Sequence, residues 1–138
     1  MLIDNSAWTR LSQSAVPRDT KARVAAMVED RSLEVCAPFL LELGYSARNA
    51  RDHEEVIGAL RRLPLREFDG RAEARALDAQ AQLARAGHHR LPIVDLMIAA
   101  IADRHGVGIL HYDGDYDVIR ERTDLRFESV WLAPRGSL

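Results

Sequence analysis

The segment from Asp95 to Asp113 constrains the fold of this chain more than any other. Residues Leu96–Ala102 are all apolar, and a helix that is apolar on every face has to be buried on all sides. Gly106 predicts the end of this helix. The next stretch, Val107–Tyr112, reads VGILHY and is the clearest strand in the sequence. A buried helix that leads directly into a strand predicts a fold in which helices pack against a sheet.

The rest of the chain alternates strands and helices in the same way. Hydrophobic spacing predicts strands at 1–4, 33–37, 63–68, 107–112 and 127–132, and helices at 6–12, 20–30, 38–50, 54–63, 71–86, 96–102 and 117–122. Pro64 favours an edge position for the third strand, because proline cannot donate to a strand ladder. This alternation is typical of α/β proteins with a mainly parallel sheet.

Length and composition predict an ordinary globular protein. The 138 residues, 47% apolar and 29% charged, fit a single domain over 1–138 and exclude a disordered or coiled-coil chain. The single cysteine, Cys36, cannot form an internal disulfide, which fits a reducing compartment. The longest apolar run, Pro92–Ala102, contains Asp95 and is well short of the ~20 residues of a membrane span. Because the N-terminus also lacks the features of a signal peptide, we expect a cytoplasmic protein.

The net charge of −2 argues against a simple module that binds nucleic acid by neutralising phosphates, because such modules are basic. Lys21 is the only lysine among 19 cationic residues. The excess of arginine fits a biased genomic composition, and it also fits bidentate phosphate binding. Arginine content alone therefore decides nothing.

Four acids fall where an α/β fold places its ligands. Asp4 ends the first strand and Asp113 ends the strand at 107–112, and ligands bind beyond the carboxyl ends of parallel strands. Asp95 begins the buried helix, and Glu42 lies one turn into the helix after the second strand. We expect these acids to converge. Clustered carboxylates raise one another's pKa unless a cation intervenes, and a set of oxygen ligands suits Mg²⁺ or Mn²⁺.

Each acid also has a simpler interpretation. Asp4 fits a turn residue after a strand, and Asp95 fits the N-cap of its helix. Periodicity places Glu42 on the solvated side of its helix, and Asp113 precedes Gly114 in a typical turn pair. Taken one at a time, these interpretations stay open.

Other chemistries match the sequence less well. Residues 113–117 resemble the start of a calcium-binding EF-hand loop, but Val118 stands where that loop needs glycine and Asp124 where it needs glutamate. The chain has no glycine-rich nucleotide fingerprint and no phosphate-binding loop. The histidines at 53, 88 and 89 lack metal-ligand spacing and are expected on the surface.

Several segments together resemble one known family. MLIDNSAW at 1–8 resembles the opening of PIN-domain nucleases, and LLELGYS at 40–46 resembles the helix that carries their second acid. The block VDLMIAAIADRHGVGILHYDGDYDVI at 94–119 resembles their most diagnostic segment, and VWLAPRGSL at 130–138 is similar to the VapC toxin branch. The resemblance covers essentially the whole chain. It implies a PIN-like three-layer α/β fold, with a central, mainly parallel sheet of four or five strands flanked by helices.

The resemblance also assigns site residues. Its catalytic residues fall on Asp4, Glu42, Asp95 and Asp113. Its metal ligands fall on Asp4, Asp95 and Asp113, with Asp115 as a more variable further acid. Ser6 matches a small hydroxyl position near the first acid, whereas Asn5 departs from the commoner threonine or serine. Nothing transfers to 52–89, which matches no family motif.

The function implied by the resemblance is a Mg²⁺-dependent endoribonuclease toxin, in which Mn²⁺ can substitute, acting on tRNA, rRNA or mRNA. The metal would orient the scissile phosphate and lower the pKa of an attacking water, leaving a 3′-hydroxyl and a 5′-phosphate. Glu42 would bind a second ion or align that water. A cognate VapB-type antitoxin and a homodimer are the implied partners. Two alternatives remain: a non-catalytic α/β protein-interaction module, and a PIN nuclease of RNA maturation or DNA repair.

The implied antitoxin also has a predicted docking place. Apolar residues around Trp8–Leu11 and Val24–Val28, beside the helix that carries Glu42, are expected to form a groove for an amphipathic helix. Trp8 is the expected anchor, because tryptophan is enriched among binding hot spots. Ordinary core packing of Trp8 is the alternative.

Overall fold

The computed structural model describes residues 1–138 and contains five short strands that pair only in parallel. They are β1 (Leu2–Ile3), β2 (Val35–Cys36), β3 (Leu65–Arg66), β4 (Ile109–His111) and β5 (Ser129–Trp131). One sheet has the order β1-β4-β5, and the other pairs β2 with β3. A parallel bridge between Leu2 and Glu34 joins the two into the spatial order β3-β2-β1-β4-β5. The predicted parallel sheet is therefore confirmed, with β3 at an edge as Pro64 indicated.

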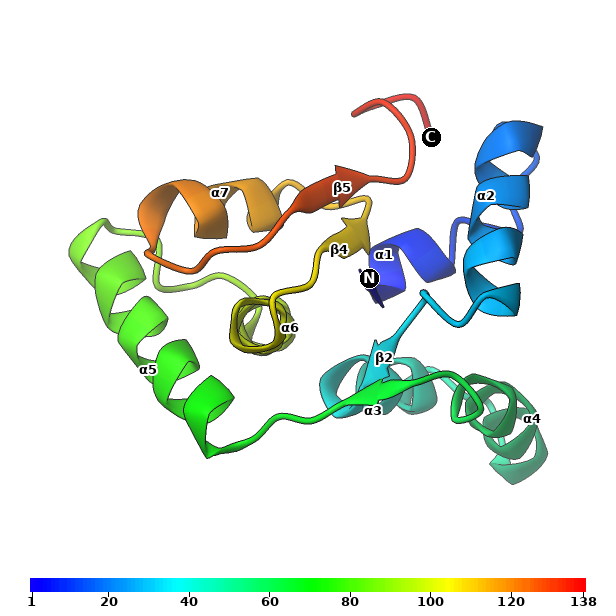
Figure 1. The fold of residues 1–138 in the computed structure, drawn as a ribbon, viewed down its shortest axis with the longest axis horizontal. Coiled ribbons are helices and arrows are strands. Elements are labelled where there is room, and N and C mark those ends of the chain that lie inside the picture. The colour runs from blue at the N-terminus through cyan, green and yellow to red at the C-terminus, as the bar shows by residue number, and fades with distance from the viewer.

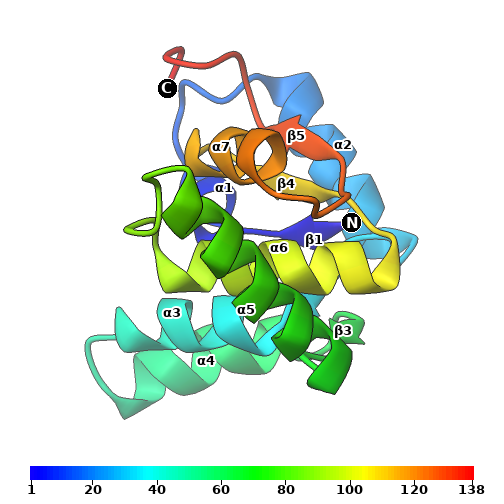
Figure 2. The same cartoon turned by 90° about the vertical axis from the view of Figure 1, so that its left-hand side faces the viewer.

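Helices cover both faces of these strands. They are α1 (Asn5–Trp8), α2 (Arg18–Glu29), α3 (Ala37–Tyr45), α4 (Ala50–Leu60), α5 (Gly70–Arg85), α6 (Ile93–His105) and α7 (Asp115–Arg122). In Figure 1, α5 and α6 lie on one side of the strands, and α2 and α4 lie on the other. Figure 2, viewed from the α5 side, shows α5 in front of α6. This arrangement confirms the three-layer α/β fold. None of these helices is long and apolar enough to cross a membrane.

Helix α6 is the buried helix that the sequence predicted. Leu96 and the run from Ile98 to Ala102 are buried, and α5, α3 and α7 all pack against it. Gly106 ends the helix in the left-handed conformation, with φ of 65°, which costs a residue without a Cβ little. The chain then passes directly into β4, so α6 fixes the position of that strand within the core.

Some predicted boundaries were wrong. The helix predicted at 38–50 ends at Tyr45, and a new helix begins at Ala50. Asn49 starts the new helix, because its side-chain oxygen accepts a hydrogen bond from the Asp52 backbone N–H at 2.9 Å. The helix predicted at 6–12 ends at Trp8 and continues as turns.

The strand order creates a crevice next to β1 and β4. From β1 the chain moves to β2 on one side, and it later returns to β4 on the other side. Ligands of open parallel sheets bind at such a switch point, outside the carboxyl ends of the strands. Asp4 follows β1 directly, and Asp113 lies two residues beyond β4.

Candidate active site and metal centre

A polar cleft opens at this switch point. It has a volume of about 260 Å³ and brings together residues from four parts of the chain: Asp4, Asn5, Ser6, Thr9, Arg10, Glu42, Pro92, Asp95 and Asp113. Asp115 adjoins it, because carboxylate oxygens of Asp95, Asp113 and Asp115 all lie within 4.8 Å of one another. The structure thus brings together every acid that the sequence singled out.

The Asp4 carboxylate accepts three hydrogen bonds. Its side chain is buried, and Oδ2 accepts hydrogen bonds from the backbone N–H and the hydroxyl of Ser6. Oδ1 accepts a hydrogen bond from the Tyr116 hydroxyl at 2.8 Å. The Ser6 hydroxyl oxygen in turn accepts from the Tyr112 backbone N–H at 2.9 Å. Asp4 therefore caps α1 and also ties β1 to the residues that follow β4.

Asp95 is not the N-cap that its position suggested. The N-cap of α6 is Pro92, and Asp95 lies in the first turn of the helix. Its side chain is buried, and Oδ2 has no hydrogen-bond partner. Burial raises the pKa of Asp95 to about 8, and repulsion from Asp4 and the other nearby carboxylates adds to the effect. A cation beside Asp95 would therefore favour its charged form.

Glu42 is not the solvated helix residue that periodicity favoured. It lies on α3 and lines the cleft, and its Oε2 is buried without a hydrogen-bond partner. Burial, followed by repulsion from Asp4 and Asp113, raises its pKa above the ordinary value. Hydrophobic periodicity cannot predict the burial of Glu42, because the cleft that this side chain faces is lined by polar residues.

Asp113 fits both of its interpretations. Its Oδ1 accepts a hydrogen bond from the Asp115 backbone N–H at 3.0 Å, which is the predicted turn. The same turn places Asp113 and Asp115 beside Asp95. Burial raises the pKa of Asp115, with repulsion from Asp113 as the second cause. One short turn therefore supplies two carboxylates to the cleft.

A partly buried chain of hydrogen bonds supports this turn. The Asp113 backbone N–H donates to His111 Nδ1 at 3.1 Å, so the ring proton lies on Nε2 and is donated to the Ser129 hydroxyl oxygen at 2.7 Å. The Ser129 hydroxyl donates to Asp117 Oδ1, and Trp131 Nε1 donates to Asp117 Oδ2. Burial lowers the pKa of His111, which keeps the ring neutral, as the donor and acceptor pattern requires.

Neither this supporting chain nor the role of Tyr116 was predicted from the sequence. A signal was present: Ser129 and Trp131 alternate along β5 and so share a face, and His111 pairs with Trp131 in the parallel register. A polar residue on an inward face has to find partners within the core. The partners themselves become visible only once β4 and β5 are known to be neighbours.

The residues of the cleft fit a bound cation. Three buried side-chain oxygens have no hydrogen-bond partner, namely Asn5 Oδ1, Glu42 Oε2 and Asp95 Oδ2, and all three residues line the cleft. Buried polar atoms are normally paired. None of the ion pairs in the structure uses an acid of the cleft. A set of carboxylate and amide oxygens that forms no ion pair with a protein cation suits a hard divalent metal ion.

The sequence of the chain is similar to those of known proteins. The family model described as PIN domain matches residues 1–122. The chain belongs to the PIN domain family. The relatives of this PIN domain include Ribonuclease VapC51 of Mycobacterium tuberculosis, which is 34% identical over 99% of the chain and 96% of its own length. Ribonuclease VapC2 of the same species is 36% identical over 96% of the chain and 94% of its own length.

Solved structures show the same fold. The chain matches a structure titled as DNA-bound VapBC from Salmonella typhimurium with a TM-score of 0.72 and 22% identity, covering 96% of this chain and 97% of that one. It also matches VapBC-5 from Mycobacterium tuberculosis with a TM-score of 0.63 and 18% identity, covering 94% and 97% of the two chains. The PIN-like fold expected from the sequence is confirmed.

Proposed function

We propose that this PIN domain, a single unit over residues 1–138, is a metal-dependent endoribonuclease of the VapC toxin type. The observation that carries the proposal is the set of unpartnered carboxylate oxygens of Asp95 and Glu42 beside Asp4 and Asp113. A non-catalytic module has no need of buried acids without partners, because each destabilises the fold. Relatives named ribonuclease that match the chain over nearly its full length support the same activity.

The proposed metal ligands are Asp4, Asp95, Asp113 and Asp115, with Mg²⁺ as the ion and Mn²⁺ as a substitute. Both oxygens of Asp4 already accept hydrogen bonds, but a carboxylate has about four acceptor positions and can still bind a cation. When bound, the ion would neutralise the scissile phosphate and lower the pKa of an attacking water.

The chain's own groups would orient the reaction. Ser6 and Tyr116 fix the Asp4 carboxylate by donating to its two oxygens. The turn at Asp113 is fixed by His111, which accepts its backbone N–H. Glu42 enters from α3, with a raised pKa and a free oxygen. We propose that Glu42 aligns the attacking water or binds a second ion.

The test is cleavage of RNA by the purified chain in Mg²⁺ and in EDTA. Cleavage should require the metal and should leave 5′-phosphate ends. The variants Asp4→Asn, Asp95→Asn and Asp113→Asn should each lose activity by ~10²-fold or more, while circular dichroism shows a folded protein. Full activity in EDTA, or in all three variants, would overturn the proposal.

We also propose that a VapB-type antitoxin inhibits the enzyme, because the matched structures are VapBC complexes. The apolar residues expected to line its groove differ in exposure: Val24 is buried in the core, whereas Val28 is 41% exposed. Trp8 is half-buried and packs against the core. We propose that the activity takes place in the cytoplasm, where an RNA substrate and such an antitoxin would be found.

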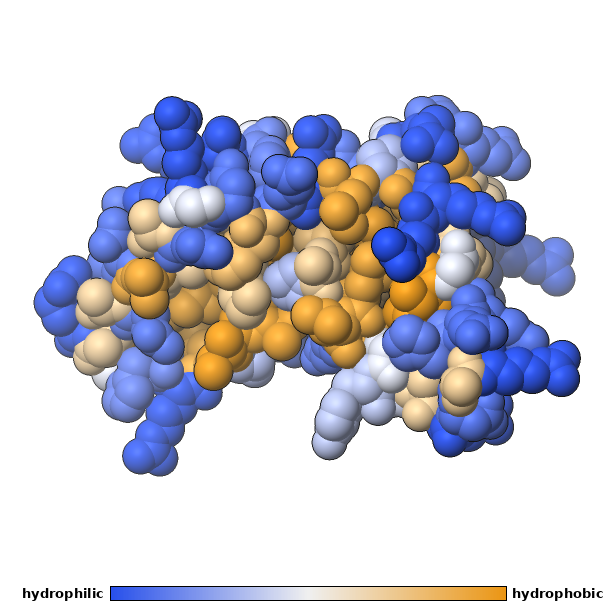
Figure 3. Space-filling view, turned by 90° about the horizontal axis from the view of Figure 1, so that it is seen from below, coloured by the Kyte–Doolittle hydropathy of each residue, from blue (hydrophilic) through white to orange (hydrophobic).

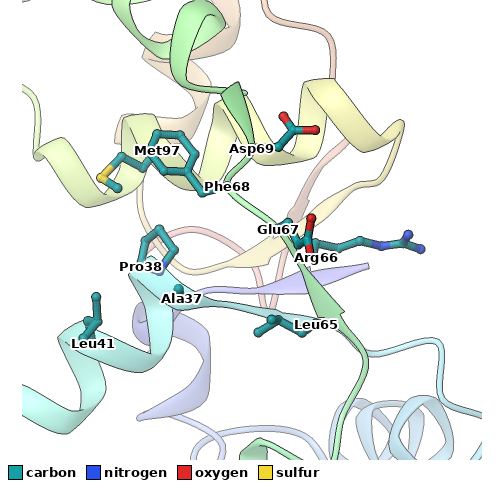
Figure 4. Close-up of a pocket in the computed structure, with 9 residues that line it drawn as sticks. All are labelled: Ala37, Pro38, Leu41, Leu65, Arg66, Glu67, Phe68, Asp69 and Met97. Carbon is teal, nitrogen blue, oxygen red and sulfur yellow. The ribbon is translucent and has the colours of Figure 1, made fainter. Parts of the chain in front are cut away.

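The proposed second partner is another copy of the chain. Adjoining hollows beside β3 share Leu41, Leu65, Phe68 and Met97 as lining residues. In Figure 4, Phe68 and Met97 lie on one side of the central hollow, and Pro38 and Leu41 lie on the other. The face in Figure 3 carries hydrophobic surface across its middle. Exposed apolar surface of this kind marks protein contacts.

Arg66, Glu67 and Asp69 also line the central hollow. Arg66 and Asp69 already pair with Glu34 and Arg104 of the same chain, so a two-fold copy would contact the chain mainly through the shared apolar residues. Light scattering should give twice the chain mass, and Leu41→Glu should give the monomer. A monomeric wild type would contradict the dimer.

A further inference from the structure

Two arginines lie beside the acidic cleft. Arg10, just beyond α1, lines the cleft together with Asp4 and Asp113. Its guanidinium carbon is 4.8 Å from the ring centroid of Tyr112, and Nη1 donates to the Ser6 carbonyl oxygen at 2.8 Å. Stacking on an aromatic face fixes the guanidinium plane and leaves most of its N–H groups free.

The second arginine comes from the C-terminal segment, which the fold and the acid site leave unexplained. After β5 the chain returns over Tyr112, whose hydroxyl donates to the Pro134 carbonyl at 3.3 Å and accepts from the Leu138 backbone N–H at 2.8 Å. This return brings Arg135 to the acid loop, which is the turn formed by residues 113–115. Gly114 stands between Asp113 and Asp115 in the sequence. Arg135 Nη2 is 3.2 Å from the position that a Cβ at Gly114 would occupy.

Neither guanidinium is used in an ion pair. All the ion pairs of the structure involve other cations. Arg10 donates only to a backbone carbonyl, and Arg135 is placed over the Trp131 ring with its guanidinium carbon 5.8 Å from the centroid. Two cations that form no ion pair therefore lie beside acids that also form none, and each cation lies over an aromatic ring.

We propose that Arg10 and Arg135 bind the backbone phosphates of the RNA that flank the scissile bond. This inference rests on the proposed ribonuclease function. A cleft of acids in a chain of net charge −2 repels a polyanion, and a metal ion neutralises it only at the scissile phosphate. Flanking phosphates need cations of their own, and planar guanidinium groups bind phosphate oxygens in a bidentate manner.

The test is steady-state cleavage of a single-stranded RNA in Mg²⁺ at several KCl concentrations. The variants are Arg10→Gln, Arg135→Gln and the double variant. The matched control is Arg62→Gln, which removes the same charge from an exposed residue after α4 that makes no ion pair. Arg10→Lys and Arg135→Lys keep the charge and lose only the planar fork.

Each Arg→Gln change should raise KM about fivefold and leave kcat within about twofold. The dependence of log KM on log salt should weaken by about 0.7 for each arginine, the value for one phosphate contact on a single strand. The Lys variants should keep most of that salt dependence, because lysine retains the positive charge. If the arginines had only a structural role, retaining the charge would not preserve the salt dependence. Arg62→Gln should behave as wild type.

The kinetic results distinguish an error in this inference from an error in the proposed ribonuclease function. If wild type cleaves RNA but the double variant keeps its KM and salt dependence, the inference is wrong and the proposed function stands. If the variants lose kcat alone, the arginines only support the acid loop, and the inference is also wrong. If wild type fails to cleave RNA in Mg²⁺, the proposed function falls and takes the inference with it. Should Arg10→Gln unfold, the exposed Arg135 decides by the same criteria.

Discussion

The Tyr116 hydroxyl donates a hydrogen bond to Asp4 Oδ1 across 2.8 Å, linking the first turn of α7 to the end of β1. Tyr116 is fully buried, so water cannot replace this donor. Burial raises the pKa of its hydroxyl well above the ordinary value, and the Asp4 carboxylate adds to the shift. Tyr116 therefore stays protonated at neutral pH. Its hydroxyl remains a hydrogen-bond donor and fixes one oxygen of Asp4, a proposed metal ligand.

The change Tyr116→Phe removes only that donor. It should weaken Mn²⁺ binding by about tenfold and lower the free energy of unfolding by about 1–3 kcal/mol, because the buried Asp4 oxygen is left unpaired. Calorimetric titration and urea unfolding measure the two effects. Tyr45→Phe is the matched control, since Tyr45 is 93% exposed. Equal metal affinity in both variants would show that Tyr116 does not position Asp4.

The raised pKa of Asp95 predicts how stability depends on pH in the absence of metal. The native state retains a proton up to about pH 8, whereas the unfolded chain releases it near the ordinary value of 3.8. The native state thus binds more protons between these values, so the free energy of unfolding falls as pH rises. The slope for this group approaches about 1.4 kcal/mol per pH unit.

Urea unfolding in EDTA at pH 5 and pH 7.5 checks this dependence. Wild type should lose stability between the two values, and Asp95→Asn should lose less because the titrating carboxyl is gone. The remaining slope should reflect Glu42 and Asp115, whose pKa values are also raised, and His111, whose lowered pKa acts in the opposite direction. The same slope in wild type and Asp95→Asn would mean that Asp95 ionises normally.

Asp117 is predicted to be structural although it closely follows the proposed metal ligands Asp113 and Asp115. It accepts hydrogen bonds from Ser129 and Trp131. Asp117→Ala should therefore lower stability by about 2 kcal/mol, through two donors left unpaired, while Mn²⁺ binding changes less than in Asp113→Asn. Glu121→Ala, an exposed acid on the same helix, is the control. Loss of all metal binding in Asp117→Ala would make it a ligand.

Parts of this fold could be predicted because local chemistry determines them. The run Leu96–Ala102 has no polar face, so only a buried helix satisfies it, and Gly106 has the freedom that the helix end needs. Pro64 correctly indicated an edge strand. The end of α3 at Tyr45 was missed, because apolar spacing continues to Ala47 and Ala50 while the Asn49 cap interrupts the helix.

The site itself divides in the same way. Asp4 and Asp113 could be placed together, since parallel strands align their carboxyl ends. Asp95 was expected to lie beside the other acids, and it lines the same cleft. The alternative interpretation of Asp95 as an N-cap was wrong, because the N-cap is Pro92, which makes no side-chain cap hydrogen bond. The contacts of Tyr116 and His111 could not be predicted, because they depend on which strands are neighbours and on how α7 is rotated.

The acids around Asp95 are proposed to bind a divalent cation. Titration of Mn²⁺ at pH 7.5, with free Mn²⁺ followed by electron paramagnetic resonance, tests this proposal most directly. Wild type should bind Mn²⁺ in a way that Mg²⁺ competes with, and Asp95→Asn and Asp113→Asn should bind at least about tenfold more weakly. Glu121→Gln should bind as wild type does. Equal Mn²⁺ affinity in wild type, Asp95→Asn and Asp113→Asn would contradict the account.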